Sequence, residues 1–323
     1  MEIIVFLRKI KNKNLMKGLT ITLLLMISAL ASGQKRQVCF SIDDLPVVSY
    51  GINDSNYQKQ IFNNIVKSLV NNRVPAIGFV NEGKMHNGKV VARYQKELLK
   101  SWIKGGLELG NHTYSHPDYN KISCMEYADN LLKGEKVLKE VLSESGKNIK
   151  YFRHPFLHVG DTKSKADSLD SFLKEHGYSV APVTIDNEDY LFALAYKRAS
   201  VDNDTMLMNR IGRDYIDYME KKLHFYERQS VALFGREITQ VLLIHASLLN
   251  SVYLDALASM YMRNGYEFVD MDTALRDEAY NQEVTCYGKW GISWIDRWAI
   301  SMGKKGEFFV GDIESPDYMR SEK

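Results

Sequence analysis

The sequence predicts an α/β protein whose strands form one parallel sheet or barrel. Two observations support this class: short apolar segments alternate with longer amphipathic ones, and chemically active side chains follow several of the apolar segments. Repeated βα units bury their strands, and the active sites of such sheets and barrels lie at the carboxyl ends of the strands. About 290 residues remain beyond the N-terminal leader described below, enough for a single barrel with a full core.

The first elements imply a βαβ unit. Residues 38–42 are a short apolar strand. Residues 57–71 carry Ile61, Ile65 and Leu69 at helical spacing, and the apolar residues 76–80 form the next strand. The alternation therefore starts close to the end of the leader.

The remaining elements continue this order. A helix over residues 123–142 is opened by Ser123 with Glu126 three residues later, the pattern of a capping box. The other predicted helices cover residues 90–104, 168–175, 205–233 and 254–264. The other predicted strands cover residues 108–110, 151–153, 178–184, 240–244 and 267–269.

Candidate catalytic side chains follow most of these strands. In chain order they are Asp43 and Asp44, His112 and His116, Arg153, Asp186 and Asp189, and His245. In a barrel these strand ends converge on one rim. One carboxylate with two imidazoles is a zinc-type ligand set that leaves coordination positions open, and a second carboxylate beside it could accept a proton from water. The set predicts a hydrolase.

Each of these features also has a plain structural interpretation. His112 and His116 alone could be polar loop residues, and Asp43 with Asp44 could form a turn or a helix cap. Arg153 could pair with a surface carboxylate, and His245 could be a buried core histidine. Their convergence on one rim favours catalysis over these separate interpretations.

The N-terminus is predicted to be a signal peptide over residues 1–31. Basic residues at positions 8–17 precede an apolar run over residues 19–30, which is short for a membrane span and ends in an A-x-A pattern. An uncleaved anchor is the alternative. Met16 would also serve as a start. Cleavage would leave no stable membrane anchor, and the protein would be periplasmic or secreted.

Composition excludes several classes of partner and site. Residues 1–31 hold five basic side chains and one acidic one, so Lys and Arg number 37 against 39 Asp and Glu in the remainder. This balance does not favour nucleic acid as a partner. The three cysteines form no C-x-x-C pair, so neither a disulfide framework nor a thiolate metal site is indicated. The composition does not determine the oligomeric state.

Five short motifs in order resemble the polysaccharide deacetylases of the NodB type, carbohydrate esterase family 4, across residues 37–275. Residues 41–46 (SIDDLP) are similar to the family's T-F-D-D-G-P, and residues 112–116 (HTYSH) match H-[ST]-x-x-H. Residues 153–156 (RHPF) match R-x-P-[FY], residues 186–190 (DNEDY) are similar to D-x-x-D-W, and residues 243–245 (LIH) match L-x-H. The resemblance implies an irregular (β/α) barrel with fewer than eight units.

The resemblance also implies a role for each matched residue. Asp44, His112 and His116 would hold Zn²⁺, or Co²⁺ or Ni²⁺, which suit the same ligands. Asp43 would be the general base, held in place by Arg153, and His245 the general acid, oriented by Asp189. The backbone N–H of Phe156 would be a second oxyanion donor, while Tyr190 and Leu243 would lie beside the substrate.

Two departures from the family pattern and the C-terminal segment bear on specificity. Leu45 replaces a glycine, which could narrow the cleft, and Tyr190 replaces a tryptophan. Residues 276–323 lie outside the resemblance and are expected to pack on the barrel as an extension. Trp290, Trp294 and Trp298 recur every four residues, which predicts one face of a short helix that packs in the core or, alternatively, stacks on sugars.

Together these features predict an exported, metal-dependent N-deacetylase that acts on an acetylated amino-sugar glycan, with peptidoglycan or chitin-like N-acetylglucosamine as substrates. Two alternatives remain open. One is an O-acetyl glycan esterase acting on substrates such as xylan. The other is a non-catalytic glycan-binding protein on the same fold, which would require a missing catalytic residue, and none of the five motifs lacks one.

Overall fold

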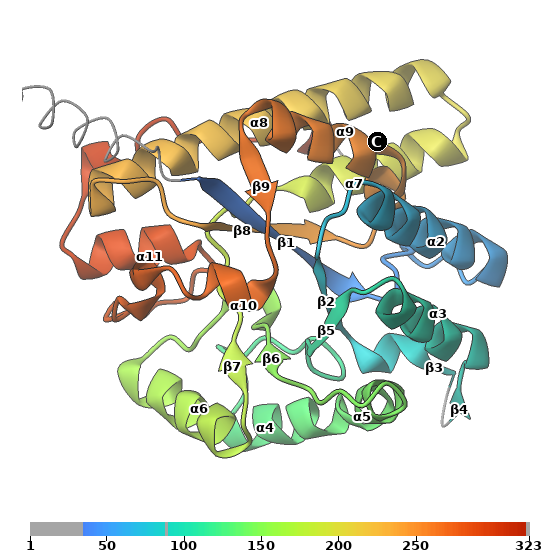
Figure 1. Ribbon diagram of the computed structural model, residues 1–323, viewed down its shortest axis with the longest axis horizontal. Coiled ribbons are helices and arrows are strands. Elements are labelled where there is room, and N and C mark those ends of the chain that lie inside the picture. The colour runs from blue at the N-terminus through green and yellow to red at the C-terminus, as the bar shows by residue number, and fades with distance from the viewer. Residues whose placement is uncertain (1–34, 88–89, 321–323) are drawn as a thin grey trace, which may run out of the picture. The chain divides into compact units, whose positions relative to one another are not determined.

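A computed structural model describes residues 35–87 and 90–320, and its centre is a parallel sheet (Figure 1). The strand order is β7-β6-β5-β2-β1-β8, and β9 also pairs with β1. The strands are β1 (Arg36–Leu45), β2 (Ile77–Val80), β5 (Glu108–Asn111), β6 (Tyr151–Phe152), β7 (Ser179–Val180), β8 (Gln240–His245) and β9 (Tyr266–Phe268). Every strand pair in this sheet is parallel, as the sequence predicts.

The chain that leaves β7 joins the two edges of the sheet. Ile185 forms a parallel bridge with Leu242 of β8. The N–H groups of Thr184 and Ile185 both donate to the Val241 carbonyl, each at 3.0 Å. The sheet therefore curves into a barrel with fewer than eight βα units, and the predicted fold class is confirmed.

Helices surround this sheet (Figure 1). They are α2 (Ser55–Asn71), α3 (Arg93–Lys104), α4 (Cys124–Lys133), α5 (Lys136–Ser143), α6 (Lys163–Glu175), α7 (Asp189–Val201), α8 (Thr205–Phe234), α9 (Leu248–Arg263), α10 (Met271–Ala274), α11 (Trp294–Ser301) and α12 (Asp317–Arg320). Many of these helices are preceded by a residue whose side chain accepts a hydrogen bond from a backbone N–H of the first turn. Ser123 and Glu126 form the predicted capping box at α4. Within the described ranges, no helix has both the length and the apolarity to span a membrane.

Several predicted elements differ from the structure: the strand predicted over residues 178–184 is only β7, α6 begins five residues before its predicted start, and α7 was not predicted. The helix predicted over residues 123–142 is two helices, α4 and α5, and Gly134 at their junction lies so close to the loop after β5 that a Cβ there would be 2.6 Å from the Thr113 carbonyl carbon. The helix predicted from residue 90 begins at Arg93, because β4 (Val90–Val91) pairs with β3 (His86–Asn87). Helix α9 begins at Leu248, six residues before the predicted start.

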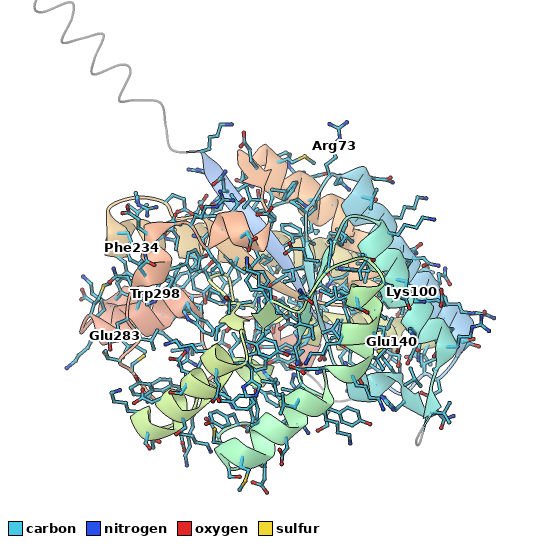
Figure 2. All side chains as sticks on the ribbon, turned by 60° about the horizontal axis from the view of Figure 1, so that its bottom comes forward. Arg73, Lys100, Glu140, Phe234, Glu283 and Trp298 are labelled. Carbon is cyan, nitrogen blue, oxygen red and sulfur yellow. The ribbon has the colours of Figure 1, made fainter. Side chains whose placement is uncertain are left out.

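The C-terminal tryptophans do not share one helix. Helix α11 begins at Trp294, capped by Ser293, so Trp290 precedes it and is 42% exposed. Trp294 and Trp298 are buried, as the core-packing interpretation expects. The ring of Trp298 meets that of Phe234 of α8 at a centroid distance of 5.7 Å, and Figure 2 labels both residues. The proposed division at residues 275 and 276 stays a prediction, and the predicted leader over residues 1–31 lies outside the described residues.

Candidate active site

The predicted metal ligands come together at the carboxyl end of the sheet. Asp44 lies at the end of β1, and His112 and His116 follow β5. One ligand atom from each of the three lies within 4.8 Å of the others, and the Nε2 atoms of both histidines are 3.9 Å from Asp44 Oδ1. Asp44 and His116 have left-handed backbones, with φ of 69° and 55°. Such strain in non-glycine residues gathers at functional sites.

The two histidines are neutral and expose the nitrogen that a metal needs. His112 Nδ1 lies 2.9 Å from the Arg153 carbonyl, which can only accept, so Nδ1 carries the proton and Nε2 keeps its lone pair. Burial lowers the pKa of His112 to about 4. Burial and the neighbouring His112 lower the pKa of His116 to about 4 as well. Both rings are therefore ready to bind a divalent ion at neutral pH.

Asp44 supplies the charge of this ligand set. Its Oδ1 atom is buried without a hydrogen-bond partner among the described residues, although it faces both histidines. Buried acceptors are rarely left unpaired, so this orphaned oxygen fits a bound cation. Burial would raise the pKa of Asp44, but Lys84 and the two histidines outweigh it and hold that pKa well below its usual range. The residues present therefore fit a divalent metal.

Lys84 is the member of this site that sequence reasoning missed. Its ammonium lies 3.0 Å from Asp44 Oδ2 and donates to the Asp44 backbone carbonyl at 3.3 Å. Lys84 follows β2 in a short helical turn (Glu82–Met85) and belongs to none of the five motifs. Only its position after a strand end could have drawn attention to it.

Asp43 and Arg153 form the buried pair that the resemblance implies. Arg153 Nη1 lies 3.2 and 3.3 Å from the two Asp43 carboxylate oxygens, and both residues are almost fully buried. Arg153 also donates to Ser41 Oγ and the Ala181 carbonyl, which fixes its position. Burial raises the pKa of Asp43, and Arg153 opposes this rise. A carboxylate with a raised pKa is a better proton acceptor, which suits a general base.

His245 and Asp189 form the second pair. His245 ends β8, where it is in register with Asp43 of β1, and its Nδ1 lies 2.7 Å from Asp189 Oδ1. Asn250 Nδ2 donates to Asp189 Oδ2 at 3.0 Å and holds that carboxylate. Burial alone would lower the pKa of His245, but Asp189 outweighs it and raises the pKa to about 9. His245 is therefore charged at neutral pH and can donate a proton. The fourth candidate carboxylate, Asp186, makes a local hydrogen bond with the Asn187 N–H at 2.9 Å instead.

The Phe156 loop is held by residues that lie outside the family resemblance. Phe156 and Leu157 are consecutive non-glycine residues with φ of 57° and 53°, and no described hydrogen bond uses the Phe156 N–H. Arg297 of α11 donates to the Leu157 carbonyl at 2.8 Å. Gly291 lies so close that a Cβ there would be 1.8 Å from the Phe156 carbonyl oxygen. No sequence motif signalled Gly291 or Arg297.

We expect Gly291→Ala to displace the Phe156 loop and lower both stability and turnover. Because the added methyl would meet backbone at 1.8 Å, the loop must move, and a strained loop survives only where its surroundings fix it. We expect a loss of about 1–3 kcal/mol in the free energy of unfolding, measured by denaturant titration. Gly105→Ala is the matched control, since its methyl would approach no described atom closer than 3.2 Å. If the two variants are equally stable, the close packing of Gly291 does not hold the Phe156 loop in place.

The remaining candidates have clear positions. Tyr190 is half-exposed, with its ring 6.5 Å from that of His245, so it can flank a substrate. Leu243 is buried, and its carbonyl accepts from Asn187 Nδ2 at 2.7 Å, so its place beside the substrate stays a prediction. The concern that Leu45 narrows the cleft is wrong. The Leu45 side chain is fully buried and packs directly on Gly78 of β2. A Cβ atom added at Gly78 would lie only 2.0 Å from Leu45 Cδ1.

The comparison with known families agrees with this geometry. Residues 31–180 match the family model described as polysaccharide deacetylase. The match covers 150 of the 323 residues, and this segment is similar to polysaccharide deacetylases. The match ends before Asp189 and His245, so the pairing of these two residues rests on the geometry of the chain itself.

Similar proteins include deacetylases from fungi and bacteria. A chitin deacetylase from Arthroderma benhamiae is 31% identical over 94 residues, which cover 29% of this chain and 23% of that protein. A peptidoglycan-N-acetylglucosamine deacetylase from Bacillus cereus is 24% identical over 139 residues, 41% of this chain and 44% of that protein. The chain thus spans less than half the length of these curated relatives.

Among solved structures, the chitin deacetylase from Colletotrichum lindemuthianum has the same fold. It aligns with a TM-score of 0.50 and 20% identity, over 75% of this chain and 89% of that one. This likeness supports the barrel architecture of the chain.

Proposed function

We propose that this protein is an exported, metal-dependent deacetylase that hydrolyses N-acetyl groups of an amino-sugar polysaccharide or oligosaccharide. Peptidoglycan and chitin-like N-acetylglucosamine are the proposed substrates. The observation that carries the proposal is the combination of a neutral histidine pair with Asp44, a buried carboxylate base and a charged histidine acid at one sheet edge. The printed names of the two curated relatives support the choice of substrate.

The chain's own residues account for each proton in the reaction. A divalent ion, for which Zn²⁺ is our first choice and Co²⁺ or Ni²⁺ the alternatives, would supply Lewis acidity for water and the acyl oxygen. Asp43 removes a proton from the attacking water, whose oxygen bonds to the acyl carbon. The Phe156 N–H donates to the developing oxyanion. As the carbon–nitrogen bond breaks, His245 gives its proton to the departing amine, and acetate is released.

Export rests on the N-terminal sequence. A basic stretch followed by a short apolar run and an A-x-A pattern is typical of a secretory signal, and polymeric glycans of the cell surface lie outside the cytoplasm. The mature protein would then meet its substrate in the periplasm or beyond the cell.

Acetate release from three substrates tests this function. Protein stripped of metal and reconstituted with Zn²⁺ or Co²⁺ is given N-acetylglucosamine oligomers, peptidoglycan and acetylated xylan. We expect metal-dependent acetate from an amino-sugar substrate. Release from xylan alone would move the assignment to an O-acetyl esterase, and silence on all three with metal bound would indicate a binding role.

The pH dependence of turnover reports the protonation state of His245, the proposed general acid. Because His245 must be protonated to donate, we expect kcat to fall as the pH rises through about 9, its raised pKa. Asp189→Asn removes the charge that raises this pKa, so the alkaline limb should move by at least about one unit to lower pH. We expect kcat to fall by about 10² on an amide, since general-acid catalysis contributes at least that much.

An ester substrate provides the comparison, because an alcohol leaves more readily than an amine and needs less help from the acid. Asp189→Asn should therefore slow an ester less than an amide. His224→Gln, which removes a partly exposed histidine paired with Glu227, is the control. If the alkaline limb of the pH profile of kcat is unchanged in Asp189→Asn, His245 is not the general acid.

A further inference from the structure

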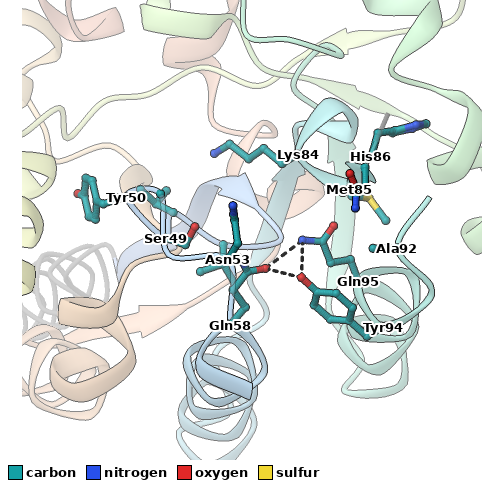
Figure 3. Close-up of a pocket in the computed structure, with 14 residues that line it drawn as sticks. Ser49, Tyr50, Asn53, Gln58, Lys84, Met85, His86, Ala92, Tyr94 and Gln95 are labelled. Atoms are coloured by element: carbon teal, nitrogen blue, oxygen red, sulfur yellow. Dashed lines mark hydrogen bonds between the residues drawn. The ribbon is translucent and has the colours of Figure 1, made fainter. Parts of the chain in front are cut away.

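A polar cavity adjoins the metal ligands. It has a volume of about 610 Å³ and lies between the loop after β1 and residues 84–87 and 92–95 (Figure 3). Lys84 belongs to both sites, since it lines the cavity and contacts Asp44. Figure 3 shows its side chain extending toward the loop that carries Ser49 and Tyr50. A substrate reacting at Asp44 would therefore have Lys84 between the scissile group and this cavity.

The lining suits a sugar ring. Two tyrosines, Tyr50 and Tyr94, contribute aromatic rings to the lining, and Asn53 contributes an amide for hydroxyl groups. Gln58 Oε1 accepts from the Tyr94 hydroxyl at 2.9 Å and from Gln95 Nε2 at 3.0 Å (Figure 3). These hydrogen bonds hold part of the lining in place before any ligand enters, which limits the entropy that binding loses.

Among the described residues that line the cavity, the side chains that can carry charge near neutral pH are basic and not acidic. None of its described residues is Asp or Glu, and its ionisable basic groups are Lys84 and His86. His86 faces the buried Glu82, whose carboxylate lies 3.6 Å from its Nε2. Lys84 has Asp44 as its ion-pair partner among the described residues. Because a divalent ion bound to Asp44 would share that carboxylate, the charge of Lys84 would then lack full compensation and would attract an anion.

We propose that this cavity holds the sugar next to the N-acetylated one and that Lys84 selects a carboxylate on that neighbouring sugar. The inference rests on the proposed deacetylase function and narrows its substrate to acidic amino-sugar glycans. The carboxylate could belong to a uronic acid or to the lactyl ether of a muramic acid. Both present the same charged group, and the experiment separates them.

The kinetic test compares three tetrasaccharides at saturating metal: neutral N-acetylglucosamine, alternating N-acetylglucosamine and glucuronic acid, and alternating N-acetylglucosamine and N-acetylmuramic acid. We expect one or both acidic substrates to exceed the neutral one in kcat/KM by about tenfold, a factor typical of one charge-assisted contact. Lys84→Met should abolish that ratio, and Lys84→Arg should keep it. Lys100→Met is the matched control, because Lys100 is about as exposed and pairs with Glu144 on the surface.

Equilibrium binding gives a readout that does not depend on turnover. The same three tetrasaccharides are titrated calorimetrically into Asp43→Asn protein, with and without Lys84→Met. We expect the acidic preference in Kd to disappear with Lys84→Met and to weaken at high salt. Equal affinity for neutral and acidic ligands, or a preference that survives Lys84→Met, would overturn the proposal. If the parent protein deacetylates neither these tetrasaccharides nor peptidoglycan, the proposed function fails, while this titration still decides the role of Lys84.

Discussion

Asp44→Ala should lose both bound metal and acetate release. Asp44 is the only carboxylate of the ligand set, and its removal leaves two neutral imidazoles beside the unpaired charge of Lys84, which repels a cation. Because the proposed metal would polarise both water and the acyl oxygen, we expect kcat/KM to fall by at least about 10³. Metal content after dialysis and acetate release measure the two losses.

A second variant separates charge from backbone strain. Asp44 has a left-handed backbone, which asparagine adopts more readily than alanine does. Asp44→Asn should therefore fold like the parent protein and still lose the metal. Asp217→Ala, which removes an exposed carboxylate paired with Lys221, should retain metal and activity. Retention of one metal per chain in both Asp44→Asn and Asp44→Ala would exclude Asp44 as a ligand, because alanine has no donor atom in its side chain.

The sequence could place the candidate ligands because parallel strands impose their geometry. Asp44 and His112 are far apart in sequence but follow the ends of strands that lie on either side of β2. Any residues at such ends approach one another, so a strand pattern with suitable polar residues is enough to predict the cluster. His245 is brought in by the same rule, since β8 pairs with β1.

The residues that brace the site could not be found in this way. Arg297 contacts Leu157, 140 positions earlier, through the packing of a helix that no strand pattern fixes. Lys84 reaches Asp44 from a short turn whose direction depends on tertiary contacts. Neither residue belongs to a repeating or spaced sequence pattern, so only the folded structure shows what each one contacts.

Leu45 shows why a substitution within a motif is hard to interpret from sequence. Alternation along a strand would assign its side chain to one face, but the pairing of β1 with β2 shifts register between Ile42 and Leu45. Asp44 adopts φ of 69° within that shift. Because of this irregularity, the Leu45 side chain points into the core and packs over Gly78. It therefore does not cover the predicted metal ligands.

Arg153→Met is expected to have the largest effect on stability. Arg153 is fully buried, and the variant would leave the Asp43 carboxylate buried without its cation. Breaking a buried pair by removing one partner typically costs about 3–5 kcal/mol. The pKa of Asp43, already raised by burial, would rise further, so the base would be more protonated and turnover would fall at neutral pH.

The pH dependence of this loss follows from the direction of the Asp43 shift. A carboxyl whose pKa is higher in the folded state costs least at low pH, where it is protonated in both states, and most at high pH, where the folded protein must hold it ionised. Denaturant titrations should therefore show a larger loss for Arg153→Met at pH 8 than at pH 5. Adding Asp43→Asn removes the unpaired charge and should restore part of the stability. Arg36→Met, which breaks a half-exposed pair with Glu227, should cost far less at either pH. A loss of equal size at both pH values would mean that lost packing, and not the unpaired carboxylate, dominates.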